Sequence, residues 1–257
     1  MIVLMLGDVV GPGGCDAVRA LLPQIKREFG ADFVIANGEN SASGNGILPN
    51  SAQHLFDSGV DVITTGNHVF RRREIHPLLE AQNGILRPAN YSPENPGGGV
   101  YVIDSPRRRL AVVNLMGTAL LEPLRNPFDA IDEILGQLDA RCIVLDFHAE
   151  ATSEKRAMGF YLDGRVSAVV GTHTHVQTAD EQILPNGTAY LTDLGMCGPY
   201  DSVLGVKPEA VIRRFRTAMP TRFENAAGTM CLCGAAIELD DATGKAVSIE
   251  RISRLWN

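Results

Sequence analysis

The stretch Val166-Ser167-Ala168-Val169-Val170-Gly171-Thr172-His173-Thr174-His175 decides how the rest of the sequence is interpreted. Its apolar first half predicts a buried strand that stops at Gly171. Two histidines then follow, with one residue between them. Side chains at i and i+2 point the same way on an extended backbone, and on a tight turn both imidazoles can reach one metal ion or two neighbouring ions. Taken alone, the pattern fits ordinary polar loop residues equally well.

Composition restricts the class of protein. The 257 residues are 45% hydrophobic and carry a formal net charge of −7, which favours one globular domain over 1–257 and argues against a stable nucleic-acid complex. No apolar run approaches the ~18–20 residues of a membrane span. The first residues resemble a strand more than a signal peptide. The five cysteines are odd in number and scattered along the chain, so we expect no disulfide framework. This predicts that the protein is located in a reducing cytoplasm.

Strand and helix patterns alternate along the chain. Apolar runs predict strands over 2–6, 33–36, 60–64, 142–147 and 166–170, and hairpins joining 100–103 to 110–115, 181–184 to 189–191 and 230–239 to 246–252. Helical spacing predicts helices over 17–29, 49–58, 72–81, 127–138, 152–161 and 208–217, with the one over 72–81 limited or kinked by Pro77. We expect a turn over 11–14, a loop over 193–205 and solvated arginines at 107–109. The alternation favours an α/β fold with a mixed sheet, or two packed sheets, and helices outside.

Side chains that can bind metals stand just after five of the predicted strands. They are Asp8, Glu39 with Asn40, Asn67 with His68, His148, and His173 with His175. Ligands of open α/β sheets gather beyond the carboxyl ends of the strands, so we expect these side chains to meet. The remaining histidines, His54 and His76, lie within predicted helices and are expected to be surface or packing residues.

The donor set limits the kind of metal site. Two carboxylates, two amides and three histidines make about seven donors, too many for one tetrahedral zinc site. They suit two metal ions bridged by a carboxylate, and mixed nitrogen and oxygen ligands fit iron, manganese or zinc. Two metals ~3.5–4 Å apart are the arrangement that clamps the attacking and leaving oxygens in displacement at phosphorus.

The motifs, in order, resemble those of the calcineurin-like metallophosphoesterases. The resemblance narrows to the YmdB-like branch and covers essentially the whole chain, through Gly7-Asp8-Val9-Val10-Gly11, Asn37-Gly38-Glu39-Asn40, Thr65-Gly66-Asn67-His68 and Asp193-Leu194-Gly195-Met196. Val10 stands where the wider superfamily has the histidine of D-x-H, and Glu39 stands where it has a bridging aspartate. Both departures match the YmdB-like branch, with Asn40 as the substitute for the missing histidine.

The resemblance implies a fold, an activity and a role for each residue. The fold is a sandwich of two packed mixed β-sheets flanked by helices. Asp8, Glu39, Asn40 and His175 would hold one metal, and Glu39, Asn67, His148 and His173 the other. His68 would protonate the leaving oxygen after metal-activated water attacks phosphorus. The expected substrates are small phosphodiesters, 2′,3′-cyclic nucleotides first, and the expected metal is iron.

Other functions remain open at this stage. The donor set also allows a phosphomonoesterase, a binuclear hydrolase of C–N or C–O bonds, or a non-catalytic, metal-dependent regulatory or RNA-associated protein. His68 is not needed to bind metal, so its presence favours catalysis. The sequence leaves open the resident metal, the physiological substrate and assembly into a homo-oligomer.

Overall fold

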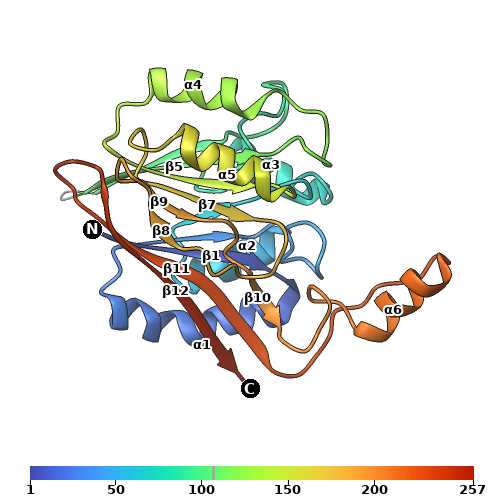
Figure 1. The fold of residues 1–257 in the computed structure, drawn as a ribbon. Coiled ribbons are helices and arrows are strands. Elements are labelled where there is room, and N and C mark those ends of the chain that lie inside the picture. The colour runs from blue at the N-terminus through green and yellow to red at the C-terminus, as the bar shows by residue number, and fades with distance from the viewer. Residues whose placement is uncertain (106–107) are drawn as a thin grey trace.

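The computed structural model describes residues 1–105 and 108–257 and contains two six-stranded sheets packed face to face, with helices outside (Figure 1). This is the α/β sandwich of two mixed sheets that the sequence predicts. Helix α1 (Gly11–Phe29) covers the first sheet, whereas α4 (Pro127–Gln137) and α5 (Thr152–Tyr161) cover the second. Among the helices of the described ranges, none has the length and apolarity to cross a bilayer.

The first sheet has the strand order β12-β11-β10-β1-β2-β3. Its strands are β1 (Ile2–Val9), β2 (Phe33–Asn37), β3 (Val62–Thr64), β10 (Met196–Pro199), β11 (Met230–Leu239) and β12 (Ala246–Trp256). β1 runs parallel to β2 and β10 and antiparallel to β11. Asp8, near the end of β1, is in register with Asn37 on one side and Met196 on the other. The first predicted ligand therefore lies in the middle of the sheet.

The second sheet has the strand order β4-β5-β6-β7-β9-β8. Its strands are β4 (Val100–Asp104), β5 (Arg109–Met116), β6 (Cys142–His148), β7 (Ala168–Thr172), β8 (Gln182–Ile183) and β9 (Ala189–Leu191). The four central strands are parallel, and the edge strands β4 and β8 are antiparallel to their neighbours. Because His148 is in register with Thr172, the carboxyl ends of β6 and β7 lie side by side.

Three apolar layers hold the sandwich together. Side chains such as Met5 from β1, Val112 from β5 and Val170 from β7 interlock between the two sheets. A second cluster joins the outer face of the first sheet to α1 and to α2 (Pro49–Asp57), and a third joins the outer face of the second sheet to α4 and α5. Fully buried aliphatic side chains of this kind contribute about 1.5–3 kcal/mol each.

Two predicted elements are shorter or more exposed than the helices that cover the sheets. The predicted helix 72–81, limited or kinked by Pro77, is divided in the structure. The chain forms a 3-10 turn (Arg73–Ile75) and then the short α3 (His76–Glu80), with Pro77 at the start of α3. Proline suits the first turn of a helix but not its interior. The predicted helix 208–217 is confirmed as α6 (Pro208–Thr217). It projects from the body, and of its residues Val211 alone is buried (Figure 1).

Two segments around β1 differ from the prediction. The expected loop 193–205 contains β10, which gains its strand character from pairing with β1 and β11 and not from its own sequence. The expected turn 11–14 is instead the first turn of α1. A Cβ atom at position 14 would lie 2.2 Å from the carbonyl oxygen of Cys197, so Gly14 is what allows α1 to approach β10.

The arginine-rich turn between β4 and β5 is partly outside the described residues, which exclude Pro106 and Arg107. Arg108 is not a solvated charge as expected. It pairs with Asp32 and, at 3.5 Å, with Asp241.

Candidate metal centre

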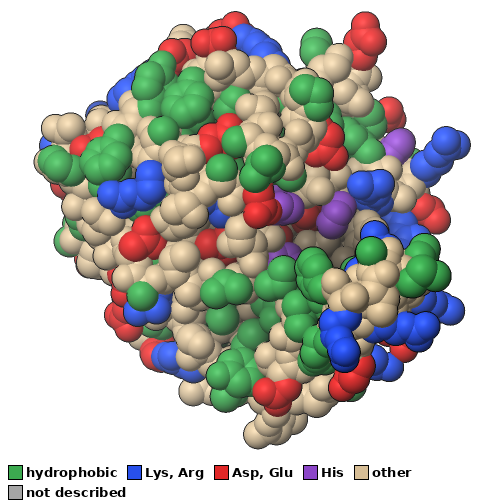
Figure 2. Space-filling view, turned by 45° about the vertical axis from the view of Figure 1, so that its right-hand side comes forward, with side chains coloured by type: hydrophobic (Ala, Val, Ile, Leu, Met, Phe, Trp, Pro, Cys, Tyr) green, Lys and Arg blue, Asp and Glu red, His purple; other side chains and the backbone are tan. Residues whose placement is uncertain are grey.

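The eight predicted site residues lie at one edge of the sandwich, where the carboxyl ends of strands from both sheets meet. They come from the ends of β1, β2 and β3 in the first sheet and of β6 and β7 in the second. Figure 2 shows histidine side chains gathered in one hollow of this face, beside acidic side chains. His54 on α2 and His76 on α3 are not part of the group, as predicted: His54 faces Asp16, and His76 packs against Phe70.

One part of the centre contains Asp8, Asn40 and His175. Asp8 Oδ1 lies 3.6 Å from His175 Nε2, and Asn40 Nδ2 lies 3.3 Å from the same nitrogen. Asp8 and Asn40 are buried. Asp8 Oδ1 is buried without a hydrogen-bond partner, an unusual condition for a carboxylate oxygen. These are three of the four residues that the resemblance assigns to one metal.

The other part contains Glu39, Asn67, His148 and His173. Glu39 Oε1 lies 3.2 Å from His148 Nε2, and Asn67 Oδ1 lies 3.2 Å from that same nitrogen. The rings of His148 and His173 are 4.8 Å apart. One donor atom from each of Glu39, His148 and His173 falls within 4.8 Å of the other two, close enough for a shared metal ion.

His68 joins the two parts. Its Nδ1 lies 2.7 Å from Asn40 Oδ1 and 3.4 Å from Glu39 Oε1. Its backbone N–H donates to Glu39 Oε2 at 2.9 Å. The ring is partly exposed, whereas Glu39 is buried. His68 is therefore anchored to the centre from one side and open to solvent on the other.

Local backbone geometry places the histidines. Gly66 is required beside His148, because a Cβ atom there would lie 2.1 Å from the imidazole Cδ2. His173 and His175 both have positive φ, 100° and 64°. Such angles are strained for residues with a side chain, and strain of this kind clusters at functional sites. The turn therefore has to be held by its surroundings.

A buried carboxylate behind His148 fixes the orientation of its ring. The Thr172 hydroxyl donates to Asp146 Oδ1 at 2.7 Å, so it accepts from His148 Nδ1, 2.9 Å away. When His148 is neutral, this Nδ1–H tautomer leaves the Nε2 lone pair available to a metal ion on the side that faces Glu39. Asp146 also accepts from Thr64 and from Asn37. Sequence reasoning missed this group, because Asp146 lies inside an apolar strand and gives no motif signal.

Charges within the centre shift its acid–base equilibria. Burial opposes the ionised form of Asp8, but the charges of His175 and His148 and the hydrogen bonds from His175 and the His173 N–H together outweigh it and hold the carboxyl pKa well below its usual range. Burial likewise opposes the charged form of His148, but the carboxylates of Glu39 and Asp8 raise its pKa to about 9. Burial lowers the pKa of His68, against the pull of Glu39. A metal bound to His148 must displace a proton that these carboxylates hold.

Glu150 is a further neighbour of the centre that sequence reasoning missed. Its Oε2 lies 2.9 Å from His173 Nε2, and its side chain is partly exposed. The signal was its position two residues after His148, on the same strand end. An acidic side chain here orients His173 and adds negative charge beside the predicted metal ligands.

Comparisons with known proteins find relatives over nearly the whole chain. The family model described as "YmdB-like protein" matches residues 4–252. A 2′,3′-cyclic-nucleotide 2′-phosphodiesterase of Bacillus subtilis (strain 168) is 49% identical over 254 residues, which are 98% of this chain and 96% of that protein. The crystal structure of a novel phosphatase of Mycoplasma pneumoniae superposes with a TM-score of 0.94 at 36% identity, covering 99% of this chain and 93% of that chain. The NAD nucleotidase of Haemophilus influenzae shares the fold alone, with a TM-score of 0.61 at 13% identity over 99% of this chain and 56% of that chain.

Proposed function

The chain belongs to the YmdB-like family, and on that premise we propose that it is a two-metal phosphodiesterase that hydrolyses small phosphodiesters, 2′,3′-cyclic nucleotides first among them. The observation that carries the proposal is that the eight predicted residues, from both sheets, converge into one network of polar contacts. Each of these atom-to-atom contacts is 3.6 Å or shorter. The name of the Bacillus subtilis relative supports the substrate class.

The residues present fit a pair of metal ions. Asp8 Oδ1 is a buried oxygen with no hydrogen-bond donor, and the surrounding donors are carboxylate, amide and imidazole. This set suits iron, the metal that we propose, with manganese and zinc as alternatives. Asp8, Asn40 and His175 would hold one ion, Asn67, His148 and His173 the other, and Glu39 both.

The bound metals would supply a nucleophile at neutral pH by lowering the pKa of a water molecule, and would neutralise the phosphate oxygens. The protein supplies the remaining steps. The carboxyl pKa values of Glu39 and Asp8 are lowered although both groups are buried, so both stay ionised. Their contacts with His148 and His175 fix those two rings. His68, anchored through Nδ1 to Asn40 Oδ1, presents its other nitrogen to the leaving oxygen. As the imidazolium, His68 carries a proton on that second nitrogen and transfers it to the leaving oxygen, becoming the neutral Nδ1–H tautomer. Because burial lowers its pKa, the imidazolium gives up this proton readily, a step worth about 10²–10⁴-fold in rate.

Metal analysis of the purified protein, paired with a screen of phosphodiester and phosphomonoester substrates, tests the proposal. We expect close to two metals per chain and faster hydrolysis of 2′,3′-cyclic AMP than of the matching monoesters. Preference for monoesters would favour the phosphatase alternative. Two bound metals without hydrolysis of any ester would favour the regulatory alternative.

Three further expectations belong to the same proposal. They are a single domain over 1–257, a cytoplasmic location and the absence of a stable nucleic-acid complex. All five cysteines are free and four are buried, which supports a reducing compartment. Light scattering of the purified protein would decide whether it forms a homo-oligomer.

A further inference from the structure

Asp193 is a buried carboxylate that the proposed mechanism does not use. It opens Asp193-Leu194-Gly195-Met196, one of the segments that carry the family resemblance, and its side chain has no exposed surface. Its Oδ2 accepts three hydrogen bonds: from the Thr174 backbone N–H at 3.1 Å, the Thr174 hydroxyl at 2.7 Å and Lys155 Nζ at 2.7 Å. Its Oδ1 accepts from the backbone N–H of Gly195 at 2.8 Å.

Thr174 is the single residue between His173 and His175. Both histidines have positive φ, so the turn does not keep its shape by local preference. One side of the turn is tied to the predicted ligand Asp8, whose Oδ2 accepts from the His173 N–H at 3.0 Å. The other side is tied to Asp193 through both donors of Thr174. These contacts fix the residue from which the two imidazoles diverge.

The segment that begins at Asp193 also contacts the strands that carry the ligands. The Leu194 N–H donates to the carbonyl of Gly171 on β7, and the Asp8 N–H donates to the carbonyl of Gly195. Asp193 is therefore the start of a short bridge between β1 and β7. A displacement of this carboxylate would therefore move residues on both β1 and β7, on either side of the metal centre.

Lys155 reaches Asp193 because Gly171, which has no side chain, leaves room for it. It comes from α5, its side chain is almost fully buried, and its aliphatic part crosses β7 at Gly171. A Cβ atom at position 171 would lie 2.9 Å from Lys155 Cδ and 1.9 Å from the carbonyl oxygen of Thr192. A buried ion pair gains little stability over apolar side chains of the same size, because both charges lose their water. The buried Lys155–Asp193 pair is thus better explained by its position next to Thr174 than by its contribution to stability.

We infer that the Lys155–Asp193 ion pair is a positioning device for the metal centre. It holds Thr174 and thereby sets His173 and His175 at the separation that two metals require. Lys155 and Asp193 touch neither metal nor substrate. The inference rests on the proposed two-metal function.

The test removes both charges together, so that no single buried charge is left. The variant is Lys155→Met with Asp193→Asn. Metal-free protein is titrated with MnCl₂, and free Mn²⁺ is followed by electron paramagnetic resonance. Partners of metal ligands contribute about 10–100-fold to metal affinity, so we expect the double variant to bind at least one Mn²⁺ about tenfold more weakly than the wild type. Circular dichroism should show that it is folded.

Thr188→Val is the matched control for the loss of a buried polar contact. Thr188 is also fully buried, just before β9, and its hydroxyl donates to the Val166 carbonyl at 2.6 Å, away from the His173–His175 turn. It should lower the melting temperature without changing Mn²⁺ affinity. Unchanged affinity for both Mn²⁺ ions in a folded double variant would overturn the inference.

A second pair of variants decides the question if the double variant does not fold. Thr174→Val removes the hydroxyl and should weaken Mn²⁺ binding, whereas Thr174→Ser keeps it and should bind as the wild type does. Equal affinity of the two variants would overturn the inference. Failure of the wild type to bind two Mn²⁺ ions would instead overturn the proposed function, and the inference with it.

Discussion

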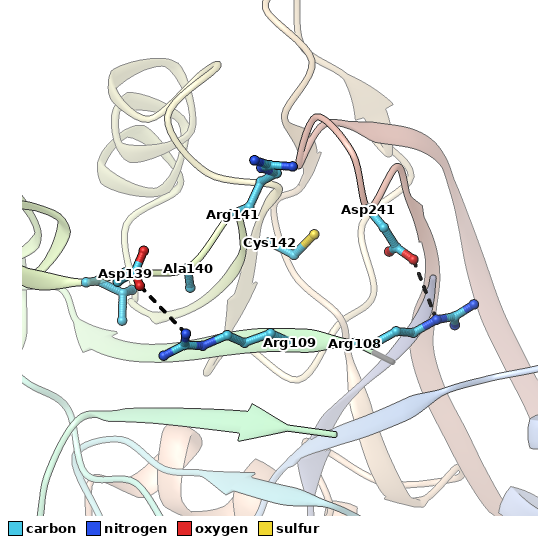
Figure 3. A pocket seen from close by; sticks show the side chains of 8 residues that line it. Arg108, Arg109, Asp139, Ala140, Arg141, Cys142 and Asp241 are labelled. Atoms are coloured by element: carbon cyan, nitrogen blue, oxygen red, sulfur yellow. Dashed lines mark ion pairs between the residues drawn. The ribbon is translucent and has the colours of Figure 1, made fainter. Parts of the chain in front are cut away.

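The two ends of the second sheet both gather charged side chains, but in opposite ways. At the carboxyl ends of β6 and β7, His148 is fully buried next to Glu39, and Asp8 Oδ1 has no hydrogen-bond partner. At the amino ends of β5 and β6, arginines surround a pocket of about 490 Å³ (Figure 3). There Arg109 pairs with Asp139 at 3.7 Å, and Arg141 donates to the carbonyl of Ala242 at 2.7 Å.

The difference in how the charges are paired distinguishes a surface pocket from a candidate reactive site. The arginine pocket is concave and charged, yet the cations in it that Figure 3 draws with dashed lines already have acidic partners on the chain. At the carboxyl end, buried carboxylate, amide and imidazole groups face one another, and Asp8 Oδ1 has no hydrogen-bond partner. Perturbed acids and bases in a confined space mark the candidate site better than concavity does.

Removing the shared carboxylate of Glu39 should have the largest effect on the metal centre. Glu39→Gln keeps the shape of the side chain but removes the charge that lies 3.2 Å from His148. We expect this variant to lose both bound metals and measurable phosphodiesterase activity, a larger effect than that of a change at His68 or Arg109. Elemental analysis with an activity assay is the measurement. Full metal content in this variant would refute the assignment of Glu39 as the bridging ligand.

His68→Ala should separate metal binding from catalysis. The side chain contacts Asn40 and Glu39 but is not needed to hold the ions. Metal content should stay at the wild-type level, while turnover falls by about 10²–10⁴-fold, the usual worth of a general acid. The matched control is His54→Ala, which removes a histidine remote from the centre and should leave turnover unchanged. Near-normal turnover in His68→Ala would remove it from the mechanism.

The pH dependence of the metal-free protein should include a contribution from His148 at the carboxyl end. The pKa of His148 rises from an ordinary 6.5 to about 9 on folding, so its contribution to stability is complete below pH 6.5 and is lost as the pH rises to about 9. Metal binding displaces the same proton, so Mn²⁺ affinity should rise over this interval. Melting temperatures with and without MnCl₂, between pH 6.5 and 9, measure both effects. A metal-induced shift that does not grow with pH would argue against displacement of a proton from His148.

Changes at the arginine pocket should be the smallest. Arg109→Ala removes an ion pair whose partners are both well exposed. Exposed pairs contribute about 0–1 kcal/mol, so the melting temperature should change little and phosphodiesterase activity not at all. Chemical denaturation and the standard activity assay suffice. A large loss of activity would mean that the two ends of the sheet are coupled in a way that the contacts do not show.

The sequence predicts which side chains meet at the strand ends but misses one strand beside them. Asp8, Glu39, His148 and His173 stand within about three residues of the end of an apolar run, and strand ends converge in an α/β sheet, so their meeting follows from general rules. By contrast, Met196–Pro199 becomes β10 only because β1 and β11 lie on either side of it. Local preference carries no sign of such partners.

The residues behind the ligands were equally hidden from sequence reasoning. Asp146 and Lys155 are buried polar side chains within a strand and a helix that look ordinary in sequence. Their roles depend on partners about 25 to 40 positions away, Thr172 and Asp193. Only the packing of β6 against β7, and of α5 against β7, brings each pair together.

The most direct test of a two-metal phosphodiesterase is the metal content of the protein purified without added metal, measured together with its hydrolysis of 2′,3′-cyclic AMP before and after chelation. We expect close to two metals per chain, hydrolysis that chelation abolishes, and recovery when metal is restored. Hydrolysis that persists in fully metal-free protein would contradict this expectation.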